Sequence, residues 1–202
     1  PTYNEAKNIK KFCKEVLNLK YNFDLIIIDD NSPDGTSKII KKLKLKYKNL
    51  FLLKRKKKLG IGSALREGMK YALKKKYYAL ITLDADLSHN PKEIPLFIKN
   101  LRSYDFITGS RYIKGGESNY GGYRDMVSRV ANKSCRFFLN MPFNEFTTSF
   151  RIYNHKCLKV LKKASLKSDG YSSQIEFFFY IYKSGLKCNE IPIKFRQRFK
   201  GN

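Results

Sequence analysis

The order of apolar and polar positions along this chain predicts short buried strands that alternate with amphipathic helices. Four apolar residues run together between Asp24 and Asp29, which predicts a buried parallel strand over residues 24–30 with carboxylates at its carboxyl end. Apolar residues then recur at helical spacing over residues 36–48, and another apolar run follows at residues 50–53. Strand, helix and strand in this order predict a crossover unit.

The same alternation continues through the rest of the chain. We predict helices at residues 61–75, from residue 91, and at residues 123–139, 155–163 and 173–184. We predict strands at residues 78–83, 106–108, 149–153 and 187–195. No internal repeat or linker interrupts the pattern. It predicts a single domain, residues 1–202, with an α/β fold: a doubly wound, mostly parallel sheet with helices on both faces.

The composition fits a globular enzyme whose surface attracts phosphate groups. Hydrophobic residues make up 42% of the 202 positions, which is enough to bury a core. The formal net charge of +25 leaves nucleic acid, anionic membranes and phosphorylated substrates open as partners. A coding sequence biased toward A and T would produce the same excess of lysine without any function.

Cysteine spacing and hydropathy set further bounds. No CxxC pair and no nearby histidine accompanies the four cysteines, so we expect reduced structural thiols in a cytosolic setting. No apolar run approaches the roughly 20 residues that span a bilayer, and no signal peptide is recognisable. We expect a soluble or peripheral segment that is truncated at both ends, because Pro1 opens on a motif that ordinarily follows a strand and Asn202 stops inside a basic loop.

Aspartates follow two of the predicted strands. Asp29 and Asp30 end the first strand, and the segment Asp84-Ala-Asp86 ends the strand at residues 78–83. Ligands of open α/β sheets bind at the carboxyl ends of the strands, so these carboxylates are expected to converge on one crevice. Two aspartates separated by one residue can both bind a hard divalent cation, which bridges the oxygens of a diphosphate. Alone, the Asp-x-Asp pattern is also common in solvated turns and helix caps.

Three segments, in this order on successive α/β units, resemble glycosyltransferase family 2. They are Pro1-Thr-Tyr-Asn-Glu5, Asp29-Asp-Asn-Ser-Pro-Asp-Gly-Thr36 and Asp84-Ala-Asp-Leu-Ser-His89. Within this family the chain is similar to the dolichol-phosphate mannosyltransferases over essentially its whole length. The shared stretches are Leu59-Gly-Ile-Gly-Ser-Ala64, Gly109-Ser-Arg-Tyr112, residues 147–153, Gln174-Ile-Glu176 and residues 195–201.

The resemblance implies a GT-A-type fold and a metal-dependent mannosyltransferase. The implied donor is GDP-mannose, the cofactor Mg²⁺ or Mn²⁺, and the acceptor dolichyl phosphate. The product, dolichyl phosphate mannose, would serve glycosylation and GPI-anchor synthesis at the cytosolic face of the endoplasmic reticulum membrane. Implied partners are the membrane surface and small membrane-anchoring subunits, with no nucleic acid.

The resemblance also assigns roles to individual positions. The nucleoside-binding pattern falls on Pro1, Tyr3, Glu5, Ile28 and Asp30. The metal and diphosphate segment falls on Asp84, Ala85 and Asp86, with both aspartates as metal ligands. Arg111, Arg124 and Arg198 fall on basic positions that face the donor or acceptor phosphates, which a planar guanidinium binds bidentately. The predicted catalytic residues are Asp84, Asp86, Arg124 and Arg198, and Arg111 and Arg198 also contact the donor.

The chain departs from the family pattern in three places. Glu145 replaces the usual aspartate, Gln197 replaces another, and the Ser-Lys pair that follows Gly201 lies beyond the sequence. Glu145 keeps the charge with one more methylene, so we expect altered geometry near the acceptor, and an active Glu145→Asp variant. We interpret His89 as capping the next helix and leave it outside the catalytic set.

Three further features have two interpretations each. Gly115-Gly116 and Gly121-Gly122 flank a polar loop and suggest a mobile flap. The cluster of Phe137, Phe138, Leu139, Met141 and Phe143, near Arg129, Lys133 and Arg136, could touch a bilayer, although core packing suits at least half of it. The aromatic run at residues 177–182 cannot lie on one helical face, which suggests a lipid-tail groove or a partner subunit beside the core.

A phosphate monoester acceptor is already anionic at neutral pH, so transfer to it needs no strong base. We therefore expect a single inverting displacement at the anomeric carbon. The alternatives are a sister enzyme that uses UDP-glucose and a polyprenyl phosphate, a basic nucleic-acid-binding module, and a scaffold without activity. No recognised nucleic-acid motif supports the second, and the intact Asp84-Ala-Asp86 segment argues against the third.

Overall fold

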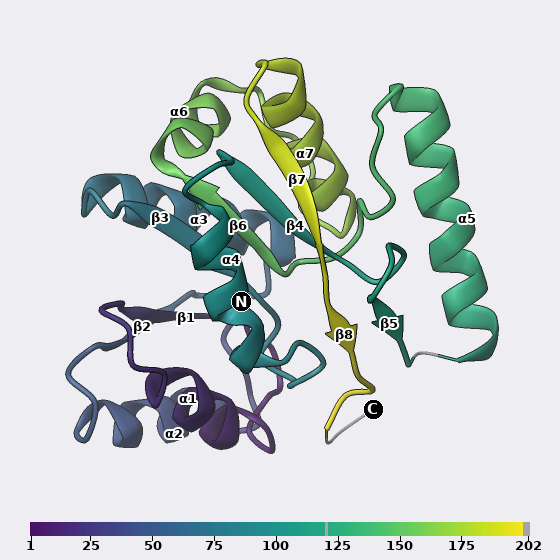
Figure 1. Ribbon diagram of the computed structural model, residues 1–202. Coiled ribbons are helices and arrows are strands. Elements are labelled where there is room, and N and C mark those ends of the chain that lie inside the picture. The colour runs from purple at the N-terminus through teal and green to yellow at the C-terminus, as the bar shows by residue number, and fades with distance from the viewer. Residues whose placement is uncertain (120, 200–202) are drawn as a thin grey trace.

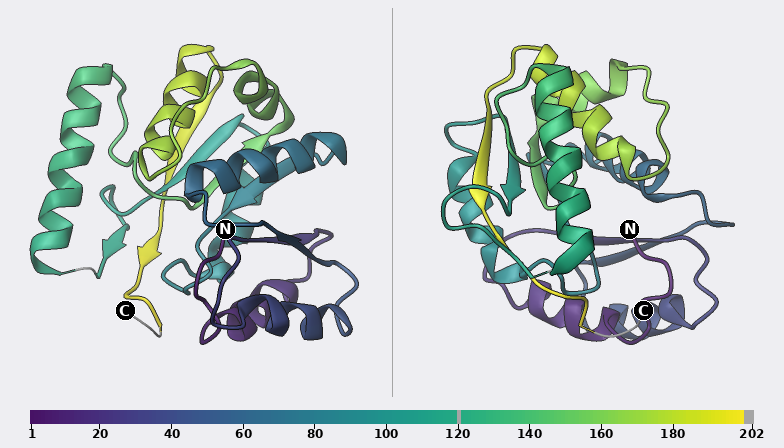
Figure 2. Two further views of the ribbon diagram at one scale, coloured as in Figure 1. Left: turned by 180° about the vertical axis from the view of Figure 1, so that it is seen from behind. Right: turned by 90° about the vertical axis from the view of Figure 1, so that its right-hand side faces the viewer.

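The computed structural model describes residues 1–119 and 121–199 and shows helices packed around a central sheet (Figures 1 and 2). The helices are α1 (Ile9–Leu17), α2 (Thr36–Lys44), α3 (Ile61–Lys74), the 3-10 turn η1 (Pro91–Glu93), α4 (Ile94–Asn100), α5 (Gly122–Leu139), α6 (His155–Lys163) and α7 (Ser172–Lys183). The strands are β1 (Leu25–Asp29), β2 (Leu50–Lys54), β3 (Ala79–Thr82), β4 (Phe106–Ser110), β5 (Glu117–Ser118), β6 (Arg151–Asn154), β7 (Cys188–Pro192) and β8 (Lys194–Phe195).

The periodicity located these elements to within a few residues, with three differences. Helix α1 was not predicted, although Ile9, Phe12, Cys13 and Val16 are buried at helical spacing. The last predicted strand is divided into β7 and β8. The loop between the glycine pairs is not a free flap, because β5 pairs with β8 and the Cα of Gly116 lies against backbone atoms of Ser110 and Arg111.

The main sheet is mixed, with the strand order β3-β6-β4-β7. Strand β6 runs antiparallel to both β3 and β4, whereas β4 and β7 are parallel. Thr82 at the end of β3 and Thr108 in β4 both face Arg151 at the start of β6. The loop that leads into β6 therefore lies at the carboxyl ends of β3 and β4, where sheets of this kind bind ligands.

Two hydrophobic cores cover the two faces of the sheet. On one face, Ile107 and Ile152 pack with α1, α2 and α4, around Ile9, Ile40 and Phe97. On the other face, their strand neighbours Phe106 and Tyr153 pack with α3, α6 and α7. Alternate residues of one strand point to opposite faces, so both faces are apolar along β4 and β6. The prediction of helices on both faces is confirmed.

The aromatic run of α7 lies in the second core. Phe177, Phe178 and Ile181 are fully buried, and Phe179, Tyr180 and Tyr182 pack against them while partly exposed. The side chains surround the helix because α3 and α6 cover it on one side and residues 141–146 on the other, with Phe143 and Phe146 4.7 and 5.5 Å from the ring of Phe178. Core packing therefore accounts for the buried part of the run, and a lipid-tail groove or partner subunit beside its partly exposed residues stays a prediction.

An apolar cavity of about 660 Å³ lies between β1 and β3 of the main sheet. Ile26, Ile28 and Leu80 line it, with Pro1 and Thr2 at its edge. Thr2 forms an isolated parallel β-bridge with Asp29, in which the Thr2 N–H donates to the carbonyl of Ile28 at 2.8 Å. The N-terminal motif is thereby held beside the carboxyl end of β1.

The four cysteines are free, and their burial is consistent with structural thiols. Burial raises the pKa of Cys13 to about 12, and burial together with nearby Asp105 raises that of Cys188 to about 12. Thiols with such pKa values stay protonated and serve mainly as small apolar groups.

We expect Phe97→Ala to lower the free energy of unfolding by about 3–5 kcal/mol. Phe97 is fully buried and its ring stacks on that of Phe150, with centroids 4.2 Å apart. Leu45→Ala, at a position that is 90% exposed, is the control and should change stability by less than about 0.5 kcal/mol. Equilibrium denaturation measures both, and equal losses would contradict the assignment of Phe97 to the core.

Candidate active site

Asp84 and Asp86 lie in the tight turn that follows β3. The carboxylate of Asp84 accepts a hydrogen bond from the Ser149 hydroxyl at 2.5 Å, and that of Asp86 accepts from the N–H and hydroxyl of Ser88 at 2.9 and 2.6 Å. Each of these bonds engages Oδ1. Leu87 adopts a left-handed conformation with φ of 67°, which folds the turn back on itself. Both carboxylates are half-buried, and Ala85 between them is buried.

His89 packs against this turn and forms a hydrogen bond with its backbone. Its Nδ1 accepts the backbone N–H of Asp84 at 3.1 Å, and its Nε2 lies 3.3 Å from the Thr148 hydroxyl. The ring is 1% exposed and packs between Phe150 and Phe195. Burial lowers the pKa of His89, and the nearby carboxylates only partly offset this, so the neutral ring is favoured. His89 thus positions Asp84, and Asn90 caps the next helix with its side chain.

Asp29 and Asp30, at the end of β1, organise the backbone around the N-terminal motif. Asp29 is fully buried and accepts hydrogen bonds from the hydroxyls of Thr2, Ser32 and Ser37 at 3.2, 2.5 and 2.6 Å. Asp30 forms an ion pair with Arg55 and accepts the N–H groups of residues 59 and 60 at 3.0 and 3.2 Å. Both oxygens of Asp30 are engaged in this way, so Asp30 shapes the loop 55–60.

Glu5 and Arg198 meet across the crevice from opposite ends of the sequence. They form an ion pair, and Glu5 also accepts a hydrogen bond from Asn8 at 2.8 Å. Burial raises the pKa of Glu5, while Asn8 and Arg198 lower it in part. The C-terminal segment is held in place because Phe199 donates its N–H to the carbonyl of Asp86 at 3.1 Å. The structure therefore brings Glu5, Asp86 and Arg198 together, and their roles toward a nucleotide sugar stay predictions from the resemblance.

The other predicted nucleoside contacts lie in different surroundings. Tyr3 is exposed beside the crevice, with the ammonium of Lys58 4.2 Å from the centre of its ring. Pro1 and Ile28 line the apolar cavity below the crevice, and Ile28 is 5% exposed. Its carbonyl accepts the Thr2 N–H, so Ile28 supports the motif through its backbone.

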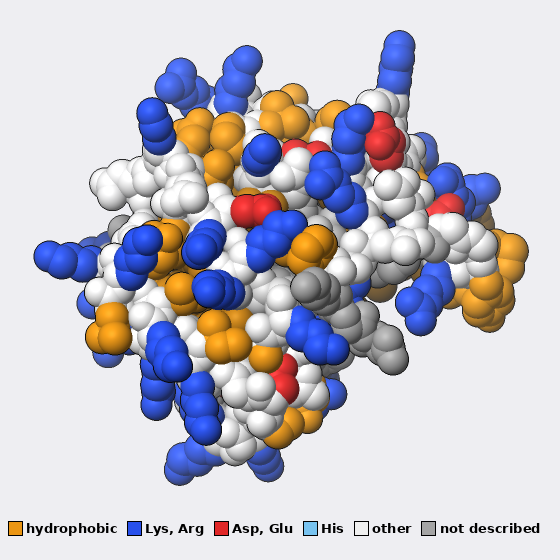
Figure 3. Space-filling model, turned by 90° about the horizontal axis from the view of Figure 1, so that it is seen from below, with side chains coloured by type: hydrophobic (Ala, Val, Ile, Leu, Met, Phe, Trp, Pro, Cys, Tyr) orange, Lys and Arg blue, Asp and Glu red, His pale blue; other side chains and the backbone are white. Residues whose placement is uncertain are grey.

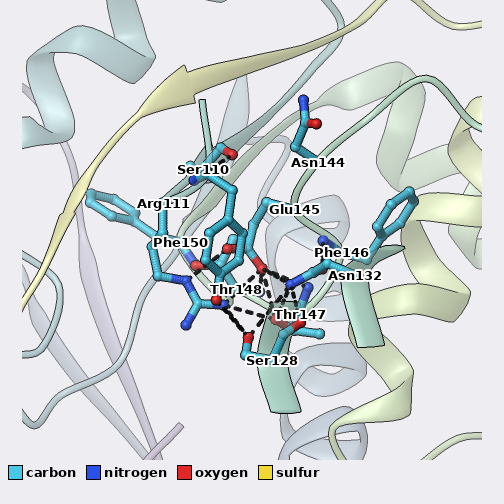
Figure 4. Close-up of polar contacts among 12 residues, drawn as sticks. Ser110, Arg111, Ser128, Asn132, Asn144, Glu145, Phe146, Thr147, Thr148 and Phe150 are labelled. Atoms are coloured by element: carbon cyan, nitrogen blue, oxygen red, sulfur yellow. Dashed lines mark hydrogen bonds and ion pairs between the residues drawn. The ribbon is translucent and has the colours of Figure 1, made fainter. Parts of the chain in front are cut away.

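Arg111 follows β4 and is neutralised by Glu145 (Figure 4). Its Nε and one terminal nitrogen donate to the two carboxylate oxygens at 2.7 and 2.9 Å, and the same nitrogen also reaches the hydroxyls of Ser128 and Thr147, each at 3.0 Å. Burial opposes ionisation of Glu145, but the hydrogen bonds and charge of Arg111 outweigh it and lower its pKa. The side chain of Glu145, which is one methylene longer than the usual aspartate, thus forms a bidentate ion pair with Arg111.

Two further residues hold Glu145 in place. Glu190, in β7, accepts the N–H groups of Asn144 and Glu145 at 3.0 and 2.8 Å. Asn132, on α5, accepts the N–H of Phe146 at 2.7 Å through its side chain. The loop 144–149 is therefore tied to the sheet on one side and to α5 on the other.

The structure does not bring Arg124 to the aspartates. Arg124 lies in the first turn of α5, which stands apart from the sheet in Figures 1 and 2, and its side chain is exposed. Within the described part of the chain, no contact of Arg124 with another predicted site residue is seen. The catalytic role of Arg124 therefore stays a prediction from the resemblance.

A pocket of about 190 Å³ opens between Asp84 and Arg111. Its other lining residues include Ser128, Ser149, Tyr171 and Gln174. These side chains were not among the predicted site residues, although residues 147–153 and 174–176 belong to stretches shared with the family. Neither amide atom of Gln174 has a hydrogen-bond partner within the described chain, although the side chain is fully buried. Only the antiparallel direction of β6 brings Ser149 to Asp84.

Asp84 and Asp86 suit a hard divalent cation, because carboxylate oxygens are the ligands that Mg²⁺ and Mn²⁺ take. Among residues 1–119 and 121–199, no group of three or more histidine, cysteine or acidic side chains could hold a metal. A cation held by Asp84 and Asp86 would take further ligands from a diphosphate or water. Mg²⁺ sites commonly have this composition.

The chain belongs to glycosyltransferase family 2, whose family model matches residues 1–161. It is 31% identical over 204 residues to polyprenol monophosphomannose synthase of Mycolicibacterium smegmatis, covering all of this chain and 77% of that protein. It is 29% identical to undecaprenyl-phosphate mannosyltransferase of Micrococcus luteus, covering all of this chain and 83% of that protein. The predicted family and the similarity to enzymes that mannosylate polyprenyl phosphates are confirmed.

Solved structures confirm the GT-A-type fold. Glucosyl-3-phosphoglycerate synthase of Mycobacterium tuberculosis, in complex with Mn²⁺, UDP-glucose and phosphoglyceric acid, matches with a TM-score of 0.74 and 16% identity, over 100% of this chain and 70% of that one. A mannosyltransferase of Pyrobaculum calidifontis, in complex with GDP-Man and Mn²⁺, matches with a TM-score of 0.65 and 16% identity, over 98% of this chain and 56% of that one.

We expect Glu145→Gln to lower the free energy of unfolding at pH 7 by about 3 kcal/mol, because it leaves the buried Arg111 without a counter-charge. The folded-state pKa of Glu145 lies below its ordinary value of 4.5, so the pair contributes fully above that pH and less as the pH falls through the folded-state pKa. The difference between wild type and variant should therefore shrink below about pH 4.5. Urea denaturation at pH 7 and at lower pH measures it.

Glu117→Gln is the control, since Glu117 pairs with Lys194 at the exposed surface. We expect a change below about 1 kcal/mol at pH 7. A similarly small loss for Glu145→Gln would show that Arg111 finds another partner.

Proposed function

We propose that this protein transfers mannose from GDP-mannose to a polyprenyl phosphate such as dolichyl phosphate. The observation that carries the proposal is the 31% identity, over the whole chain, to a polyprenol monophosphomannose synthase. The arrangement of the site supports it, because the half-buried Asp84 and the buried Arg111 border one pocket at the carboxyl ends of β3 and β4, and Asp86 lies in the same turn as Asp84.

The chemistry of the pocket suits an acceptor that needs no general base. The phosphate monoester is anionic at neutral pH and attacks the anomeric carbon directly in a single inverting displacement. Neutral His89 is held by Asp84 and Thr148, so it is not placed to deprotonate a hydroxyl. Arg198 and Arg111, which pair with Glu5 and Glu145, would share these pairs with phosphate oxygens through charge-assisted hydrogen bonds. The resemblance adds Arg124 on the acceptor side.

The two aspartates support the use of Mg²⁺ or Mn²⁺. A bound divalent cation would neutralise the diphosphate as it leaves, and Asp84 and Asp86 would hold it. Ser149 and Ser88 orient these carboxylates by hydrogen bonds to Oδ1 of each, and Oδ2 of Asp84 lies 3.6 Å from Nδ1 of His89. This shell fixes the side chains before substrate arrives.

A polyprenyl-phosphate glucosyltransferase that uses UDP-glucose is the alternative. The motifs for metal and diphosphate suit both donors. A structure bound to UDP-glucose and one bound to GDP-mannose each match this chain at 16% identity, so the fold does not separate the two donors.

The cellular setting stays a prediction from the sequence resemblance. It comprises the cytosolic face of the endoplasmic reticulum, a role in GPI-anchor synthesis and small anchoring subunits. The two relatives named above come from Mycolicibacterium smegmatis and Micrococcus luteus, so a bacterial polyprenyl phosphate is an equally suitable acceptor.

We expect GDP with Mn²⁺ to raise the melting temperature by roughly 5–10 °C when GDP is present at about 100 times its Kd. A ligand that binds only the folded protein stabilises it by mass action, and the cation strengthens binding of the diphosphate. Thermal unfolding with GDP, UDP and ATP, each with and without metal, measures the preference. A larger shift with UDP would favour the glucosyl donor, and no shift with any nucleotide would contradict both enzymes.

We expect Asp86→Asn to reduce turnover at least about a hundredfold, because it removes charge from the diphosphate site. The melting temperature should stay within about 2 °C of the wild type, since the side chain is half-buried in a surface turn. Asp24→Asn, at the amino end of β1, makes the same chemical change far from the carboxyl ends and should keep activity. Radiolabelled mannose transfer measures turnover, and an active Asp86→Asn protein would overturn the metal assignment.

A further inference from the structure

Gln174 lies in the first turn of α7 and lines the pocket that opens between Asp84 and Arg111. Its backbone groups have partners: the N–H donates to the carbonyl of Tyr171 at 3.0 Å, and the carbonyl accepts from the guanidinium of Arg151 at 2.5 Å. The side chain is 0% exposed, yet neither its amide oxygen nor its amide nitrogen has a hydrogen-bond partner within the described chain. Its capacity to donate and accept hydrogen bonds is therefore unused by the protein.

An amide in this state is unfavourable, because no hydrogen bond offsets the loss of its contacts with water. Other polar side chains that line the same pocket have partners. The hydroxyl of Ser149 donates to Asp84 at 2.5 Å, and the hydroxyl of Thr147 donates to Glu145 at 2.7 Å. Buried polar groups without a partner are rare in folded proteins. Gln174 therefore differs from these neighbours in a way that packing does not explain.

Helix α7 holds the amide of Gln174 in a fixed place. Phe177, Phe178 and Ile181 anchor the helix in the second core, and the hydroxyl of the buried Ser173 donates to the carbonyl of residue 170 at 2.7 Å. No helix in the described part of the chain, α7 included, is long and apolar enough to cross a membrane. A binding group on a packed helix is placed more precisely than one on a loop. The position of this amide is thus set before any ligand arrives.

The pocket is too small for a whole nucleotide sugar and adjoins the turn that suits a diphosphate. Its volume of about 190 Å³ lies below the roughly 300–1,000 Å³ of pockets that enclose larger organic ligands. Asp84 and Gln174 both line it. In a nucleotide sugar the anomeric carbon is joined directly to the diphosphate, so the sugar ring lies next to the group that holds the phosphates. With the diphosphate at Asp84, the ring is the part of the donor that reaches Gln174.

We propose that the side-chain amide of Gln174 binds hydroxyl groups of the hexose that is transferred and so selects the sugar of the donor. This inference deepens the proposed function and rests on it. A hydroxyl both donates and accepts, and an amide offers an acceptor and a donor side by side, so two neighbouring hydroxyls of a ring match its two ends. A site that hydrogen-bonds a substrate hydroxyl strongly rejects an analogue that lacks it, because the buried group is then left unpaired.

Charge does not distinguish one sugar from another. Figure 3 shows lysine and arginine side chains spread over the face of the molecule seen from below, and the net charge of +25 attracts phosphate groups of any kind. In the pocket itself, Arg111 is neutralised by Glu145. A neutral amide in a fixed place is the kind of group that responds to the positions of hydroxyls.

The test compares the binding of a nucleotide sugar with that of its nucleotide alone, by calorimetric titration in the presence of Mn²⁺. We expect Gln174→Met, which keeps the shape of the side chain but removes the amide, to bind GDP-mannose about tenfold more weakly than the wild type. GDP, which has no sugar at this position, should bind within about twofold of the wild type. The matched control is Asn22→Leu, which removes an exposed amide ahead of β1 and should bind both ligands as the wild type does.

Thermal melting of the protein without ligand separates binding from a structural role. Removal of an amide that has no partner breaks no hydrogen bond, so Gln174→Met should melt at or above the temperature of the wild type. A melting temperature more than about 5 °C lower, or a variant that does not fold, would show that the amide is satisfied inside the protein and would overturn the proposal. Equal binding of GDP-mannose by wild type and variant, or equal weakening for GDP-mannose and GDP, would overturn it too.

Analogues of GDP-mannose that each lack one ring hydroxyl identify the contact. At least one analogue should bind the wild type about tenfold more weakly than GDP-mannose while Gln174→Met binds both alike, which is the non-additivity expected of two groups in contact. Additive losses for every analogue would overturn the proposal.

The choice of nucleotide separates this proposal from the proposed function. If the wild type binds UDP-glucose and not GDP-mannose, the proposed donor is wrong, and the same comparison of UDP-glucose with UDP then tests Gln174. If the wild type binds GDP-mannose and Gln174→Met binds it equally well, the proposed function stands and the role of Gln174 fails. A wild type that binds no nucleotide sugar overturns both.

Discussion

The ion pair between Arg111 and Glu145 connects the sheet, the loop before β6 and helix α5. A guanidinium buried at the end of β4 is stable only if a carboxylate neutralises it and oxygens accept its remaining N–H groups. Glu145 and the hydroxyls of Ser128 and Thr147 do this. Because these partners come from different elements, the ion pair determines where the loop and α5 lie, and hence the shape of one side of the pocket.

The turn that carries Asp84 and Asp86 lies against segments from the two ends of the described chain. Asp29 gathers the hydroxyls of Thr2 and Ser32, which holds the N-terminal motif at the end of β1. The C-terminal segment then crosses the aspartate turn, where Phe199 bonds to Asp86 and Arg198 reaches Glu5. The aspartate turn thereby places negative charge that would suit a cation next to the guanidinium of Arg198, which would suit phosphate oxygens, as the proposed transfer from a nucleotide sugar requires.

Helix α5 is attached to the rest of the protein through polar contacts on one face and exposes large apolar side chains on the other. Its inner face is held by Ser128 and Asn132, while large apolar side chains point outward. Exposed apolar surface of this extent is unfavourable in water, so an apolar environment would stabilise the helix in its present orientation.

The sequence by itself determined the order of strands and helices, the family, and the aspartates at the carboxyl ends of β1 and β3, because these depend on local periodicity and on short contiguous motifs. Tertiary structure alone decided that β6 runs antiparallel and brings Ser149 to Asp84, since strand direction within a sheet leaves no mark on the pattern of one strand. It also decided that Glu145 neutralises Arg111, that Asp30 is engaged by Arg55, and that Arg124 stands apart on α5. An apolar run such as Phe137-Phe138 looks the same in a sequence whether it is buried or exposed. Its place is settled by which face of the helix finds hydrogen-bond partners, and these lie far away along the chain.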